Sequence, residues 1–217
     1  MIEIHTKTTP KIKFQSEQRI NEIQSGHIYM KELDYFRILE QDEGDLDVGD
    51  MAEAIPFSTA YETPSGIPCT LRVMDGTKSN YVMCLMEPVF KNGRCIFTDV
   101  QKQKFEAWGE SALVITDVNE LYNRIANVVN EDMYLYSGNV FYYNENEPET
   151  IERMEMETKG LYTLAFMKRM KYAYQQEYRF VVQSEKIRQD NITFEIGDIS
   201  DISVKLASKQ LLENGLI

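Results

Sequence analysis

The segment from Ala112 to Val129 constrains the fold most, because it joins a wholly apolar run to a clear helix start. The run Ala112-Leu113-Val114-Ile115-Thr116 is typical of a strand that is buried on both faces. Asp117-Val118-Asn119-Glu120 has the spacing of a capping box, with Asp in place of Ser or Thr, and apolar residues follow at helical intervals. We therefore predict a buried strand followed directly by an amphipathic helix.

The N-terminal region is predicted to form a strand, a helix and a second strand. Ile2 and Ile4 alternate with Glu3 and His5, which favours a first strand. Ser16 can cap a short helix that ends before Gly26, where a left-handed residue would reverse the chain. The run 27–33 alternates well enough to return as a strand beside the first.

The remaining segments contain more strands than helices and lack a regular βαβ rhythm. We expect hairpins around 91–93 and 137–139, strands at 178–182 and 192–196, and helices near 105–108, 161–170 and 208–212. This order predicts one α+β domain over residues 1–217, with a mixed, largely antiparallel sheet and a few flanking helices.

The composition fits a packed, water-soluble domain. Of the 217 residues 43% are hydrophobic and 27% are charged, which excludes a disordered chain and a membrane protein. No run approaches the roughly 18 apolar residues of a membrane-spanning helix, and the N-terminus lacks the pattern of a secretory signal. The three cysteines form no C-x-x-C pair, so we expect a reducing, cytoplasmic location.

The formal net charge of −12 argues against nucleic-acid binding through bulk charge. Such a charge attracts basic proteins over long range, so a protein partner is expected, and carboxylates could also mimic the phosphates of a nucleic acid. The acidic stretch between Glu40 and Glu53 reads as a solvated loop. Its candidate partner-binding residues are Asp42, Glu43, Asp45 and Asp47.

The most informative polar cluster is Tyr174-Gln175-Gln176-Glu177-Tyr178-Arg179. If this segment is extended, Gln175, Glu177 and Arg179 share one face of a strand. These three side chains either link neighbouring strands through hydrogen bonds and an ion pair, or they form one wall of a polar site. In the second reading, Glu177 could stabilise the positive charge that develops when ADP-ribose is transferred from NAD, and Gln175 could orient the acceptor.

Two further groups of residues are candidates for the same site. Asp50 and Glu53 could cap a helix, contribute to a polar site with Glu177, or serve solubility alone. A divalent metal held by these three carboxylates would indicate a metal-dependent nuclease, although we expect no metal. His5 would hold the adenine-side ribose of NAD, or it is simply a surface residue of the first strand.

The order of several short motifs resembles an uncharacterised family of bacterial and phage proteins found near phage-resistance genes. The matching residues are Ser25-Gly26, Ile28-Tyr29-Met30, Tyr35-Phe36, Gly49-Asp50 with Glu53, and Gln175-Gln176-Glu177-Tyr178-Arg179. The sequence differs from the family in having Val48 where an Arg is common and Gln175 where a Glu is common. The family outline is in turn distantly similar to ADP-ribosyltransferases.

The resemblance implies an ADP-ribosyltransferase-like fold and a phage or mobile-element protein that uses NAD to modify a host or defence target. Glu177 and Gln175 would then be catalytic, and Arg179, Tyr174 and Asp50 would support the pocket. The main alternative is a non-catalytic acidic protein that inhibits a host defence factor. A metal-dependent nuclease is the third hypothesis.

Overall fold

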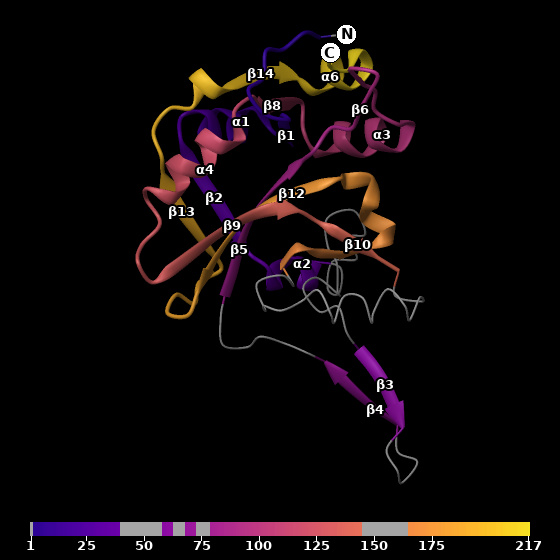
Figure 1. Ribbon diagram of the computed structural model, residues 1–217, viewed down its shortest axis with the longest axis vertical. Coiled ribbons are helices and arrows are strands. Elements are labelled where there is room, and N and C mark those ends of the chain that lie inside the picture. The colour runs from indigo at the N-terminus through magenta and orange to yellow at the C-terminus, as the bar shows by residue number, and fades with distance from the viewer. Residues whose placement is uncertain (1, 40–57, 63–67, 73–78, 145–164) are drawn as a thin grey trace.

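The computed structural model describes residues 2–39, 58–62, 68–72, 79–144 and 165–217 (Figure 1). Within these residues the chain has the predicted α+β class, built on an antiparallel sheet of eight strands. Six of the strands form one path, in the spatial order β13 (Asn191–Glu195), β2 (His27–Glu32), β5 (Ser79–Met86), β1 (Lys11–Gln15), β8 (Ser111–Ile115) and β14 (Ser203–Ala207). The other two, β12 (Glu177–Ser184) and β9 (Met133–Asn139), join the sheet through β5.

The other elements are helices and two-stranded sheets. The helices are α1 (Glu17–Gln24), α2 (Asp34–Ile38), α3 (Asp99–Trp108), α4 (Val118–Ala126) and α6 (Ser208–Asn214), with 3-10 turns η3 (Met170–Gln175) and η4 (Ser200–Ile202). The small sheets pair β3 (Ser58–Glu62) with β4 (Pro68–Arg72), β6 (Phe90–Lys91) with β7 (Arg94–Cys95), and β10 (Phe141–Tyr143) with β11 (Met167–Arg169).

The sheet forks along one edge of β5. On its other edge, β5 pairs with β12 over its full length, from Ser79↔Ser184 to Met86↔Glu177. On the forked edge β5 pairs with β2 only near Val82 and with β1 only at Met86. On this edge, no described strand pairs with the backbone between these two points, from Met83 to Leu85. This fork positions the candidate site.

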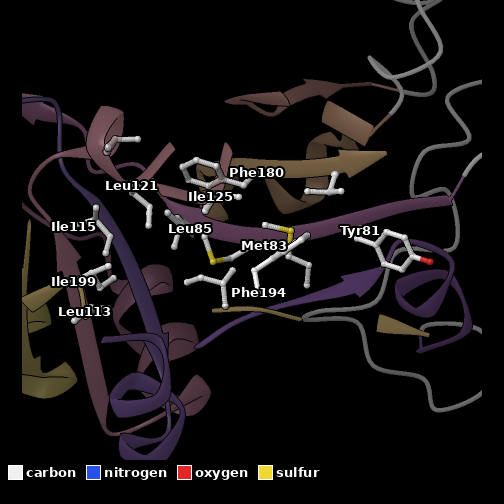
Figure 2. Close-up of a cluster of buried hydrophobic side chains, with 14 of the residues drawn as sticks. Tyr81, Met83, Leu85, Leu113, Ile115, Leu121, Ile125, Phe180, Phe194 and Ile199 are labelled. Carbon is white, nitrogen blue, oxygen red and sulfur yellow. The ribbon is translucent and has the colours of Figure 1, made fainter. Parts of the chain in front are cut away.

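The main core lies between the sheet and the helices α1 and α4 (Figure 2). Leu121 and Ile125 of α4 pack with Phe180 of β12 and Leu113 of β8, and the exposed fraction of each is 1% or less. Burying one such side chain stabilises the fold by roughly 1.5–3 kcal/mol. Alternate residues of β12 therefore face this core, and the residues between them face the opposite side of the sheet.

A second core fills the opposite side of β1 and β8, under α3 and α6. Phe14 stacks on Phe105 with ring centroids 4.9 Å apart, and Leu211 of α6 is fully buried in the same cluster. The two cores anchor both sides of the β1–β8 half of the sheet, which holds one arm of the fork in place.

Several sequence predictions are confirmed. All five residues of β8 are buried, and Asp117 caps α4 by accepting a hydrogen bond from the Glu120 N–H at 3.0 Å. Ser16 caps α1 in the same way, and Gly26 adopts a φ of +98°. The predicted strands in the last third correspond to β12 and β13, and the predicted terminal helix corresponds to α6.

The predicted first strand is wrong. Ile2 makes only an isolated bridge to Leu216, and His5 is an exposed residue outside any strand. The first strand of the sheet is β1, in which Ile12 and Phe14 are buried. Ile2 and Ile4 pack partly against the second core, which accounts for their apolar character without a strand.

One predicted hairpin is confirmed in place and the other is wrong. Around 91–93 the hairpin consists of the short strands β6 and β7. Around 137–139 the chain continues in β9, which pairs with β12 as far as Asn139, and Gly138 has no positive φ that would reverse it. The segment after β9 forms β10, which pairs in parallel with β11.

The predicted helix over 161–170 is also corrected where it falls on described residues. Met167–Arg169 is the strand β11, and Met170 begins the turn η3. The apolar stripe that indicated a helix included Ala165, which is instead fully buried against Leu33, Val82 and Val181. Tertiary contacts therefore decide the conformation of this segment.

Candidate functional site

The fork of the sheet opens into a cavity of about 500 Å³. Its walls come from β1, α1, β2, α2, β5 and the start of β12, together with Trp108, Lys168 and Gln175. Where β5 lacks a neighbouring strand, Lys13 of β1 reaches across, and its Nζ donates to the Cys84 carbonyl at 2.9 Å. The ammonium group thus satisfies a backbone acceptor that a strand would otherwise pair.

A buried ion cluster lies on one wall of this cavity. Glu177 Oε1 is 2.6 Å from Lys168 Nζ, and Glu177 Oε2 is 2.7 Å from Arg179 Nε. The exposed fractions of the three side chains are only 4%, 1% and 8% for Lys168, Arg179 and Glu177. Arg179 also donates from Nη1 to the Ala165 carbonyl at 2.6 Å. Two cations therefore hold one carboxylate in place.

The cluster keeps Glu177 ionised. Burial alone would raise its pKa, but the charges of Arg179 and Lys168 and their hydrogen bonds outweigh burial, so the pKa lies well below its ordinary value. Burial and the nearby charge of Glu177 raise the pKa of Tyr142, whose hydroxyl accepts from the Glu177 N–H at 2.8 Å. Glu177 is thus suited to electrostatic stabilisation of a positive charge and not to proton transfer near neutral pH.

Cys84 lines the same cavity but is not an activated nucleophile. Burial, followed by the charge of Glu177, raises the pKa of its thiol to about 12. Because the thiolate is the reactive form, the thiol is inert near neutral pH.

The structure brings Gln175, Glu177 and Arg179 to one cavity, although not by the predicted backbone. Glu177 and Arg179 share a face of β12, as expected. Gln175, however, belongs to η3, because Gln176 has a φ of +46° and interrupts the extended run. The Gln175 side chain is 2% exposed and still reaches the cavity wall, so the turn replaces the strand in positioning it.

The other sequence candidates lie elsewhere. Tyr174 packs its ring 6.4 Å from that of Phe105 in the second core, and its hydroxyl accepts from Gln175 Nε2 at 3.4 Å. His5 is exposed and is not among the residues that line the cavity. The acidic candidates fall outside the described residues: Asp42, Glu43, Asp45, Asp47, Asp50 and Glu53.

Sequence reasoning missed four of the five basic side chains of the cavity. Arg179 was predicted, whereas Lys13, Arg19, Lys31 and Lys168 were not. The alternation of Ile12 and Phe14 with Lys11, Lys13 and Gln15 is the signal that could have identified β1 and the first of these lysines. No local sequence pattern predicts the position of Lys168, because the place of this residue at the cavity depends on the parallel pairing of β10 with β11.

The charge of the cavity is opposite in sign to that of the chain. Five basic side chains face two carboxylates, Glu22 and Glu177, among its described lining residues. Arg19 is 2.7 Å from Glu22, and Lys31 Nζ lies 4.2 Å above the ring of Tyr35. Tyr29, Tyr35 and Trp108 add aromatic surface. The cavity can therefore hold an anionic ligand that carries a flat ring.

No group of three or more His, Cys, Asp or Glu suited to hold a metal ion occurs in the part of the chain that the structure describes. In that same part, no helix has both the length and the apolar character needed to cross a membrane.

Comparisons of the chain with protein-family models, with curated proteins and with solved structures found no match.

Proposed function

We propose that the cavity binds NAD and that the protein transfers its ADP-ribose to an acceptor. The observation that carries this proposal is an ionised carboxylate, Glu177, fixed on the wall of a cavity whose other charged side chains are mostly basic. The volume of about 500 Å³ falls within the roughly 300–1,000 Å³ common for ligand sites. The basic side chains would pair with the pyrophosphate of NAD, and the aromatic walls would contact its rings.

In the proposed reaction, the bond between the nicotinamide nitrogen and ribose C1′ breaks, and its electron pair leaves with nicotinamide. An acceptor atom forms the new bond to C1′ and releases a proton to solvent. Positive charge develops on the ribose as the bond breaks, and the Glu177 carboxylate would stabilise it. Each carboxylate oxygen already bonded to a cation keeps a second acceptor site for a ribose hydroxyl.

Gln175 would orient the acceptor, and Lys168 and Arg179 would act as positioning residues for Glu177. The two cations also weaken the field of the carboxylate, because the cluster carries a net charge of +1. The attraction of Glu177 for the neutral ribose would therefore be weak before the reaction, and the carboxylate would act mainly on the positive charge that develops on the ribose as the bond breaks.

The test incubates the protein with adenine-labelled NAD together with lysate proteins and DNA as acceptors. We expect labelled macromolecule with the native chain and a loss of about 100-fold or more with Glu177→Gln. Glu213→Gln, which changes an exposed glutamate of α6, is the matched control. Circular dichroism checks that each variant is folded.

Because Glu177→Gln disturbs a buried ion cluster, Lys31→Ala provides a second test. Lys31 is half-buried at the cavity wall and does not contact the cluster. Its loss should weaken NAD binding about tenfold, equivalent to about 1.4 kcal/mol. Absence of any labelled product from the native chain, or equal labelling by a folded Glu177→Gln variant, would overturn the proposed transfer.

A non-catalytic acidic interaction protein is the second candidate, favoured by the net charge of −12. It would bind a basic partner through exposed carboxylates, and this binding would weaken with salt. Glu177→Gln would leave such binding unchanged, whereas joint neutralisation of Asp42, Glu43, Asp45 and Asp47 would abolish it. The two candidates thus respond to different substitutions.

A further inference from the structure

The segment from Val89 to Val100, which contains the hairpin of β6 and β7 and the start of α3, exposes four large apolar side chains. Val89, Phe90, Ile96 and Val100 are 48%, 37%, 71% and 51% exposed, and all four lie within residues 89–100. Single exposed apolar residues are common on protein surfaces, but a group within one short segment marks a contact surface. We call Val89, Phe90, Lys91, Arg94, Ile96 and Val100 the hairpin surface.

A groove of about 680 Å³ lies within this surface. Val89 and Ile96 form apolar walls, and the buried residues Met86 and Cys95 lie at its base. The turn between the two strands holds Asn92 and Gly93 at φ values of 52° and 73°, which fixes the hairpin in a tight reversal. The groove is therefore defined by backbone geometry and by side chains anchored in the second core.

The basic residues at the groove carry charge that the described part of the chain does not neutralise. Lys91 and Arg94 both line the groove and are exposed. Neither forms an ion pair with another described residue, whereas Arg19, Arg124 and Lys168 do. Asp99, in the first turn of α3, is the one carboxylate of the segment 88–100, which leaves that segment with a net charge of +1 on a chain of −12.

We propose that the hairpin surface docks an acidic segment of a partner protein that carries large apolar side chains. The apolar side chains would fill the groove between Val89 and Ile96, and the carboxylates would pair with Lys91 and Arg94. The charges of Lys91 and Arg94 favour an acidic segment over a basic segment. The apolar walls favour a segment with large apolar side chains over a segment that is only acidic. The proposal is independent of NAD binding, because none of its six residues lines the cavity of the sheet fork.

The test measures binding of three short fluorescent peptides by anisotropy. The first has leucines among glutamate and serine residues, the second has lysine in place of glutamate, and the third has serine in place of leucine. We expect the first peptide to bind at least about tenfold more tightly than the other two, and its affinity to fall with salt.

Two variants locate the binding site. Ile96→Ser removes the most exposed apolar wall, and the pair Lys91→Glu and Arg94→Glu reverses the local charge. Each should lower affinity for the first peptide about tenfold. Val204→Ser and Lys186→Glu, both exposed and remote in sequence, are the matched controls. Equal binding of the glutamate and lysine peptides, or no binding of the glutamate–leucine peptide, would overturn the proposal. Unchanged peptide binding by Ile96→Ser would overturn it as well. So would self-association of the protein that rises with concentration and that Ile96→Ser abolishes.

Discussion

Lys168 Nζ lies 2.6 Å from Glu177 Oε1, although the two residues belong to different sheets. The turn η3 and the left-handed Gln176 reverse the chain between β11 and β12 and so bring the two side chains together. Arg179 approaches the other carboxylate oxygen from β12 itself. The carboxylate is therefore fixed by one cation from its own strand and one from a neighbouring sheet.

Removing the carboxylate from this cluster should destabilise the fold strongly. Glu177→Gln leaves Lys168 and Arg179 without the buried anion that they share, so we expect a loss of about 3–5 kcal/mol in the free energy of unfolding. Lys168→Met should cost less, because Arg179 still pairs with Glu177. Urea unfolding measures both variants, and Glu213→Gln should stay within about 0.5 kcal/mol of the native chain. Equal stability of Glu177→Gln and the native chain would contradict the described ion pairs of Glu177.

Stability should depend on pH through Glu177. Its pKa is lowered in the folded protein, so the unfolded chain takes up a proton first as the pH falls. The stabilisation by Glu177 is complete at neutral pH and decreases below about pH 4.3, the ordinary pKa of glutamate. Unfolding midpoints from neutral to acidic pH should fall more steeply for the native chain than for Glu177→Gln, and parallel curves would contradict this expectation.

The cysteine of the cavity should resist alkylation. Burial raises the pKa of the Cys84 thiol to about 12, so very little thiolate is present at neutral pH. Iodoacetamide labelling followed by mass spectrometry should show Cys84 protected in the folded chain and modified after unfolding. Labelling of folded Cys84 as fast as a free cysteine peptide would contradict the raised pKa of this thiol.

The fold of the first helix was predictable from local signals. Ser16 and Gly26 mark its ends because a cap needs a side-chain acceptor and a reversal needs a positive φ. The strand β8 and the helix α4 were predictable for the same reason, since an apolar run and a capping residue act within a few positions. The pairing of strands across the sheet was not predictable, because the partners of β5 come from distant parts of the sequence.

The site was only partly predictable. Glu177 and Arg179 alternate on one strand, so their shared face followed from the period of two. The contribution of Lys168 depends on a strand pairing between β10 and β11 that no local pattern specifies. The fork itself depends on where β1 and β2 leave the edge of β5, which is a property of the whole sheet.

Gly26 offers a sharp test of the connection that leads into β2. A Cβ atom there would lie 2.1 Å from the Gly197 carbonyl oxygen, and the φ of +98° disfavours any other residue. Gly26→Ala should therefore destabilise the protein by about 2 kcal/mol or more. Gly197→Ala is the matched control, because its φ is also positive but, apart from Gly197 and its two chain neighbours, no described residue has an atom within 4 Å of its Cβ position. A smaller loss for Gly26→Ala than for Gly197→Ala would contradict the described backbone.

Calorimetric titration of the native chain with NAD tests the central claim most directly. We expect one NAD to bind per chain, with about tenfold weaker binding for Lys31→Ala and unchanged binding for Glu213→Gln. No detectable heat with the native chain at high NAD concentration, or equal affinity of Lys31→Ala, would contradict the assignment of the fork cavity as an NAD site.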